Sequence, residues 1–104
     1  MDLTLHTADD IVKLLCDRLR KERLARQMTQ ADVAARSGIG VNTVSNLEAG
    51  KNVGFESLVK VAMVLGYGEA LEDLFKPKID SLDDILRYEK SAARQRVKRK
   101  KSDA

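Results

Sequence analysis

The sequence predicts an all-helical protein, and three observations support this prediction. Apolar residues recur at three- and four-residue spacing in several segments of the 104-residue chain. Hydroxyl residues followed by carboxylates mark helix starts, and glycines mark helix ends. No alternating β-branched run continues beyond three or four positions, so no strand is predicted. We expect one domain over residues 8–76 and a C-terminal extension over residues 77–104.

The first three predicted helices follow one another closely. The first covers about residues 8–27, is capped by Thr7, and has two carboxylates in its first turn. Thr29 can cap a second helix over 30–37, which Gly38 ends because glycine adopts a left-handed conformation at little cost. A third helix covers 41–48. The inward face of the first helix is made of Ile11, Leu14, Leu15, Cys16 and Leu19.

The remaining predicted helices are shorter or less apolar. A fourth follows Gly54, and its apolar stripe consists of Phe55, Leu58, Val61, Ala62 and Leu65. A fifth covers about residues 69–75, and Pro77 closes the domain. Beyond it, Ser81 starts a short sixth helix. Apolar content falls after Tyr88, so we expect residues from about 91 onward to form a disordered basic tail.

Residues 30–49 have the spacing that a helix-turn-helix requires. Two short helices that cross around a tight turn need a small residue at their close approach, a glycine at the turn and apolar residues pointing inward. Ala34 is the small residue and Gly38 the turn residue, and Val44 and Leu47 follow at positions that face the same core. Together these positions predict a helix-turn-helix.

This segment resembles the Cro and phage-repressor family, also called XRE-type helix-turn-helix regulators. The matching text is Thr29-Gln30-x-x-Val33-Ala34-x-x-x-Gly38-Ile39-x-x-x-Thr43-Val44-Ser45-x-x-Glu48-x-Gly50-Lys51, with Arg23 upstream and Leu58-x-x-Val61-Ala62-x-x-Leu65-Gly66 downstream. The resemblance covers about residues 11–75. It implies a five-helix lambda-repressor-like domain that uses its third helix for recognition and binds operators as a dimer.

The third helix holds the candidate base-reading residues. In the resembled family, the positions of Val41, Asn42 and Asn46 touch base edges. An asparagine amide donates and accepts hydrogen bonds at once, which suits the N6 and N7 atoms of adenine. We therefore expect Asn42 and Asn46 to read bases and Ser45 to adapt to either partner. Val41 replaces a polar residue common in the family and could pack on a thymine methyl group.

Other residues are expected to hold the backbone of DNA or the fold itself. The resemblance implies that Gln30 holds a phosphate and braces the recognition helix, and Thr29 precedes the same helix, where backbone amides favour anions. Lys51 and Asn52 are expected phosphate contacts, which give salt-dependent affinity without reading sequence. The resemblance also implies a partly buried salt bridge between Arg23 and Glu48.

An apolar cluster ends the predicted domain. Leu71, Leu74 and Phe75 lie where dimers of the resembled family often meet, although ordinary core packing is the alternative. A dimer is favoured because one recognition helix spans few base pairs and two-fold symmetry doubles the site.

Charge is distributed unevenly along the chain. The net charge of the whole chain is +3, yet residues 87–104 contain eight basic and two acidic residues, a net charge of +6. This tail could be a solvated end, a DNA-tracking arm, or a docking element for another protein. Short proteins of this family with a basic extension resemble HipB-type antitoxin regulators, which are encoded beside HipA-like kinase toxins.

The same sequence argues against several other classes. One cysteine and one histidine leave no metal cluster, and we find no nucleophile–base pair or phosphate-cradling glycine loop, so we expect no enzyme and no cofactor. No apolar run approaches the about 20 residues that span a bilayer, which predicts a soluble cytoplasmic protein. The predicted function is a dimeric, sequence-specific repressor of double-stranded DNA, which could autoregulate a toxin–antitoxin operon. The alternative is a protein-docking antitoxin module.

Overall fold

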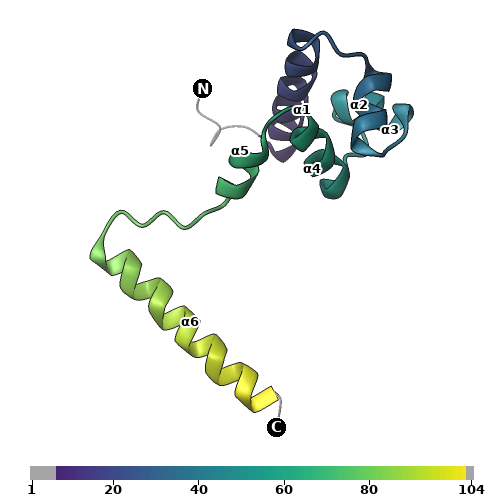
Figure 1. Ribbon diagram of the computed structural model, residues 1–104. Coiled ribbons are helices and arrows are strands. Elements are labelled where there is room, and N and C mark those ends of the chain that lie inside the picture. The colour runs from purple at the N-terminus through teal and green to yellow at the C-terminus, as the bar shows by residue number, and fades with distance from the viewer. Residues whose placement is uncertain (1–6, 103–104) are drawn as a thin grey trace. The chain divides into compact units, whose positions relative to one another are not determined.

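The computed structural model describes the backbone of residues 7–102 and the side chains of residues 7–95, and every regular element in this part of the chain is a helix (Figure 1). The chain divides into two units, Met1–Leu74 and Phe75–Ala104. The first unit contains α1 (Ala8–Ala25), α2 (Gln30–Ser37), α3 (Val41–Glu48), α4 (Phe55–Val64) and α5 (Gly68–Asp73), and the second contains α6 (Leu82–Ser102). The all-helical prediction is confirmed.

Capping boxes start the first two helices. The Thr7 hydroxyl accepts a hydrogen bond from the Asp10 backbone N–H at 3.1 Å, and the Asp10 carboxylate accepts one from the Thr7 N–H at 3.2 Å. Thr29 and Asp32 make the same pair of bonds at α2, at 3.0 and 2.9 Å. Each box satisfies two backbone donors that have no partner within the helix.

Four of the helices in the first unit end in the same way. In each, a backbone N–H just beyond the helix reaches back five residues to a carbonyl, and the residue before this N–H adopts a positive φ. Gly38 (φ 71°) has this role after α2, where the Ile39 N–H donates to the Ala34 carbonyl at 3.1 Å. After α1 the positive φ of 57° belongs to Gln27, so α1 ends at Ala25, two residues before the predicted end.

The core of the first unit lies where α1, α2, α3 and α4 meet. Contacts join α2 to α3 and α4, and α3 to α1 and α4 (Figure 1). The nine buried apolar residues are Cys16, Leu19, Val33, Ala34, Val44, Leu47, Val61, Ala62 and Leu65. Every helix from α1 to α4 contributes at least two of them, so none of these short helices depends on its own propensity alone.

Two residues predicted to face the core are exposed instead. Leu15 is 42% and Phe55 is 63% accessible. Both have the helical spacing of their apolar stripes, but within the first unit none of the described elements covers that edge of α1 and α4. Leu15 and Phe55 instead line an apolar groove of about 290 Å³ together with Val12, Cys16, Gly50, Val53 and Leu58.

The last two helices differ from their predicted bounds. The fifth was expected over residues 69–75, but α5 ends at Asp73, and Phe75 has a φ of 61° beyond it. The sixth was expected to be short and followed by disorder, yet α6 continues to Ser102. Its Ala, Arg, Gln and Lys residues have high helix propensity, and its acidic first turn suits the helix dipole. The expected disorder followed from low apolar content, which does not by itself oppose a helix.

Candidate nucleic-acid interface

One side of α3 is fixed against the core. Val44 is 0% and Leu47 1% accessible, and Glu48 is 8% accessible although it carries a carboxylate. The helix is preceded by Gly40 as its N-cap, a residue without a side chain that could accept a cap hydrogen bond, and it is only eight residues long. An isolated helix of this length is unstable in water. Its position therefore depends on these buried contacts.

The opposite side of α3 is open to solvent. Asn42 and Asn46 are exposed and lie one turn apart, and each is two positions from Val44. Two positions correspond to about 200° around the helix axis, so both amides lie opposite the buried stripe. Ser45 is exposed at the flank of this face, and Val41 is 46% accessible at the helix start. The four predicted base-reading residues thus share one exposed region of α3.

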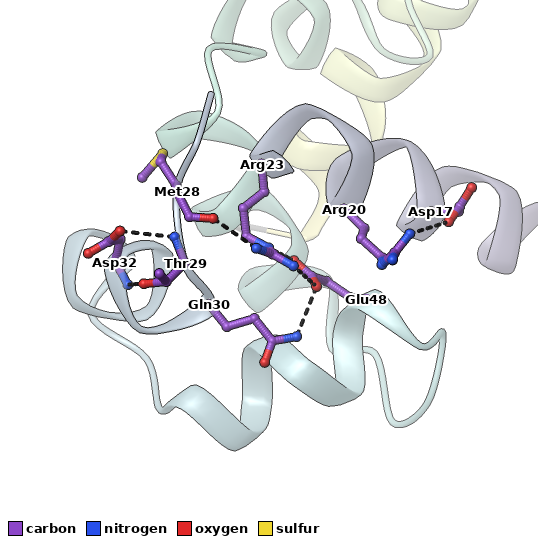
Figure 2. A network of polar contacts seen from close by, with 8 residues as sticks. All are labelled: Asp17, Arg20, Arg23, Met28, Thr29, Gln30, Asp32 and Glu48. Atoms are coloured by element: carbon purple, nitrogen blue, oxygen red, sulfur yellow. Dashed lines mark hydrogen bonds and ion pairs between the residues drawn. The ribbon is translucent and has the colours of Figure 1, made fainter. Parts of the chain in front are cut away.

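Figure 2 shows a polar network that joins α3 to α1 and α2. Arg23 of α1 donates two hydrogen bonds to Glu48, from Nε to Oε2 at 2.6 Å and from Nη2 to Oε1 at 3.1 Å. Its third nitrogen, Nη1, donates to the Met28 carbonyl at 2.8 Å. The Gln30 amide nitrogen donates to Glu48 Oε1 at 3.0 Å. One carboxylate thereby receives donors from two helices, and the end of α3 is tied to both.

This network determines what Gln30 can offer to a ligand. Its side chain is half-buried, and one of its two amide protons is directed at Glu48. The second amide proton is the donor left for an external acceptor such as a phosphate oxygen. The resemblance led us to expect Gln30 to hold a phosphate and brace the recognition helix. The hydrogen bond from the Gln30 amide to Glu48, the last residue of α3, is the contact that braces this helix.

Thr29 is engaged more fully than the sequence indicated. Its N–H donates to Asp32, and its hydroxyl accepts from the Asp32 N–H. The same hydroxyl also lies against the Asp32 carboxylate, so a phosphate would compete with that carboxylate for the hydroxyl proton. The Thr29 N–H bond, followed by the hydroxyl contact and the charge of Arg36, holds the pKa of Asp32 below its usual range. The start of α2 thus already has a carboxylate at its positive end.

The loop after α3 presents Lys51 and Asn52. Both are exposed, and the Lys51 N–H donates to the Asn46 carbonyl at 2.8 Å, which closes the end of α3. Asn52 has a φ of 50°, a left-handed conformation that asparagine tolerates better than most residues. Gly50, with a φ of 72°, packs against Lys13 of α1. The loop is therefore held from two sides next to the exposed face of α3.

Arg20 was not predicted from the sequence as a site residue. It lies one turn before Arg23 on α1, and a polar hollow of about 330 Å³ is lined by Asp17, Arg20, Gln30, Ser45, Glu48 and Ala49. Arg20 Nη1 is 3.8 Å from Asp17 Oδ1 (Figure 2). The three-residue spacing from Arg23 was the signal that could have placed Arg20 near α3.

The residues expected at a dimer interface have different environments. Leu71 is half-buried and packs against the core of its own unit, Leu74 is 45% accessible, and Phe75 is 87% accessible. Leu71 and Leu74 line a second apolar groove of about 280 Å³ with Leu15, Arg18, Leu19, Leu58, Ala62, Tyr67 and Ala70.

The single cysteine lies in the core. Burial raises the pKa of the Cys16 thiol, which keeps it protonated and unreactive.

Within the described part of the chain, no group of three or more His, Cys, Asp or Glu side chains is placed to hold a metal ion. None of the described helices is both long and apolar enough to cross a lipid bilayer.

Comparison with known proteins gives one match. Residues 19–71, just over half of the chain, match the family model described as Helix-turn-helix. The match begins within α1 and ends within α5, so it contains the whole of α2, α3 and α4. No curated protein matches the chain. The chain belongs to the XRE-type helix-turn-helix family of DNA-binding transcriptional regulators.

Proposed function

We propose that this regulator is a dimeric repressor that reads a palindromic operator through Asn42 and Asn46. The observation that carries the proposal is the placement of both amides on the exposed face of α3, opposite Val44 and Leu47. Each amide can donate to N7 and accept from N6 of an adenine in the major groove. Ser45 and Val41 flank them, and Val41 contributes apolar contact with a thymine methyl group.

Phosphate contacts position the recognition helix. Gln30 uses its second amide proton, Thr29 its hydroxyl proton, and the loop after α3 adds Lys51 and Asn52. Lys51 is the one cation among these four residues, so their combined share of the salt-dependent affinity is small. The Arg23–Glu48–Gln30 network supports this arrangement, because it prevents α3 from tilting when the helix enters the groove.

Dimerisation uses the residues where the first unit ends and the second begins. Leu71, Leu74 and Phe75 are the contact residues that we propose, and two exposed leucine-lined grooves show that this unit has apolar surface to bury. A two-fold dimer would place the recognition helices on half-sites about one helical turn of DNA apart.

A second candidate function is the binding of a protein partner. The same apolar grooves favour a protein-docking role, in which a HipA-like kinase toxin is bound and DNA binding autoregulates a toxin–antitoxin operon. Co-expression with the neighbouring gene product tests this directly. A complex that survives purification supports the antitoxin assignment, and a protein that elutes alone from its neighbour contradicts it.

The base-reading assignment is tested by binding to the DNA upstream of the gene. Replacing Asn42 and Asn46 together by alanine should weaken binding to that DNA by about 100-fold or more, because each amide–adenine pair contributes about 1–3 kcal/mol. Met63→Ala, a change at an exposed residue of α4, is the control. Fluorescence anisotropy with a labelled duplex measures both. Unchanged affinity of the double variant would refute the assignment.

A further inference from the structure

The two units of the chain have opposite charge. Residues 1–74, which contain the helix-turn-helix, have nine basic and eleven acidic residues, a net charge of −2. Residues 75–104 have ten basic and five acidic residues, a net charge of +5. Attraction to the DNA backbone depends on cations that neutralise phosphates. The unit that reads bases therefore supplies little of the long-range attraction that a DNA-binding protein uses.

The positive charge of the second unit is placed on α6. Its first turn is acidic, with Asp83 and Asp84, and basic residues predominate from Arg87 onward. A helix dipole favours cations only in the last turn. Arg87, Lys90 and Arg94 lie two to four turns before the end at Ser102, so the helix dipole does not account for them.

These cations have few partners in the part of the chain whose side chains are described. Nη2 of Arg87 lies 3.4 Å from Oδ1 of Asp84. The Arg87 guanidinium also stacks over the Tyr88 ring, with its central carbon 5.2 Å from the ring centre. Lys90 and Arg94 are exposed, and neither forms an ion pair with a described side chain. They are four residues apart on one face, where like charges repel. In the sequence, Lys98 follows Arg94 after four residues and Lys101 follows Lys98 after three, which are both helical spacings.

We propose that α6 is a second DNA-binding element, which contacts the phosphates of duplex DNA beside the site read by α3 and recognises no sequence. This inference rests on the proposed operator binding. A helix of 21 residues is about 32 Å long, which corresponds to about nine base pairs of duplex. Its row of cations neutralises phosphates along that length, and the same contacts relieve the repulsion within the helix.

The connection between α5 and α6 permits this arrangement. Eight residues, 74–81, separate the two helices and include Pro77. An extended chain of that length spans about 26 Å. The tether thus keeps α6 close to any DNA that the first unit holds. Contacts that would be weak in a free peptide become effective at the millimolar local concentration of a short tether.

The composition of α6 favours DNA over a lipid surface. A helix that lies in a membrane interface inserts bulky apolar side chains on the face opposite its cations. The exposed bulky apolar residues of α6 lie in its first two turns, at Leu82, Ile85, Leu86 and Tyr88, ahead of most of the cations. The apolar residues after Tyr88 are Ala92, Ala93, Val97 and Ala104. The basic part of the helix therefore gains little from insertion, whereas phosphate contacts require only exposed cations.

The test removes charge while it preserves the helix. The full chain carries Lys90→Gln, Arg94→Gln, Lys98→Gln and Lys101→Gln, since glutamine has nearly the helix propensity of lysine and arginine. The matched control exchanges lysine and arginine at the same four positions. Binding to a labelled duplex of random sequence is measured by anisotropy between 50 and 200 mM salt, and circular dichroism verifies that both variants remain helical.

The charge-removing variant should bind the random duplex at least about 10-fold more weakly at 100 mM salt. The slope of log K against log salt should become less steep by up to about 3.6, at about 0.9 for each lost phosphate contact. The charge-preserving control should match the wild-type chain. An unchanged slope in the charge-removing variant would overturn the proposal. So would a loss of binding to phosphatidylserine vesicles that is not accompanied by a loss of binding to DNA.

A failure of the α6 proposal can be distinguished from a failure of the proposed operator binding. The chain with Asn42→Ala and Asn46→Ala should lose its preference for operator DNA but keep the α6-dependent salt slope. If no DNA sequence is preferred by the wild-type chain, the operator proposal fails while the α6 proposal is judged by the slope alone.

Discussion

At the scale of single residues, Glu48 is the acceptor on which the position of α3 depends. It receives hydrogen bonds from Arg23 and Gln30, and Arg23 also holds the Met28 carbonyl in the turn before α2. The resemblance implied the Arg23–Glu48 pair. The Met28 contact could not be predicted from sequence, because it depends on the left-handed Gln27 that turns this carbonyl toward α1. The spacing of residue types in a sequence does not predict local backbone geometry of this kind.

Removing this carboxylate should destabilise the first unit strongly. Glu48→Ala leaves the Arg23 guanidinium buried without its anion, and we expect the free energy of unfolding to fall by about 3 kcal/mol. Chemical denaturation followed by circular dichroism measures the change. Glu56→Ala is the matched control, because Glu56 pairs with Lys60 at the surface with its side chain 83% accessible. The control should cost at most about 0.5 kcal/mol. Equal losses in the two variants would contradict the account.

At the scale of elements, both ends of α2 were predicted correctly, whereas two residues of the predicted apolar faces are exposed. The start of α2 at Gln30 and its end at Ser37 follow from Thr29 and Gly38, whose roles depend only on local backbone chemistry. The exposure of Leu15 and Phe55 could not be predicted in this way. Periodicity shows which residues share a face but not whether another element covers it. The length of α6 was missed because its helix depends on propensity rather than on an apolar stripe.

The capping box of α2 gives a prediction about pH. Hydrogen bonds from Thr29 lower the pKa of Asp32 in the folded chain below its value in the unfolded chain. A lowered folded pKa means that the ionised carboxylate stabilises the fold above about pH 4, and that this contribution is lost as the pH falls through the folded pKa. Asp32→Asn should therefore lower the thermal midpoint at neutral pH and flatten its dependence on acid.

Thermal melts between pH 3 and pH 7 check this expectation. Asp83→Asn, the same change in the first turn of α6, is the control and should leave the melting of the first unit unaltered. If Asp32→Asn and the wild-type chain lose stability in parallel as the pH falls, the box does not contribute as proposed.

At the scale of the whole molecule, the first unit has a small core and leaves apolar side chains exposed at its surface. Its buried residues come from four helices, yet the two grooves expose side chains of α1, α4 and α5. A core of this size gains stability when a second copy covers part of that surface. The assembly that we propose thus serves both affinity for a two-fold operator and the stability of each copy.

Disruption of the proposed dimer contact tests this step. Leu74→Glu places a charge on a side chain that is 45% accessible, so the chain should still fold but shift toward monomer. Sedimentation equilibrium should report a halved mass at micromolar concentration, and operator affinity should fall by at least about 10-fold because one half-site is lost. Met63→Glu, on α4 at a residue that is 61% accessible and outside both grooves, should remain dimeric. A dimeric Leu74→Glu chain would exclude this contact.

The most direct test of the central claim, that the exposed amides of α3 read bases, is enrichment of bound duplexes from a randomised DNA pool. The wild-type chain should enrich a two-fold site, and the chain with Asn42→Ala and Asn46→Ala should still bind DNA but enrich no sequence. If the double variant enriched the same site as the wild-type chain, the account of α3 as the reading helix would be contradicted.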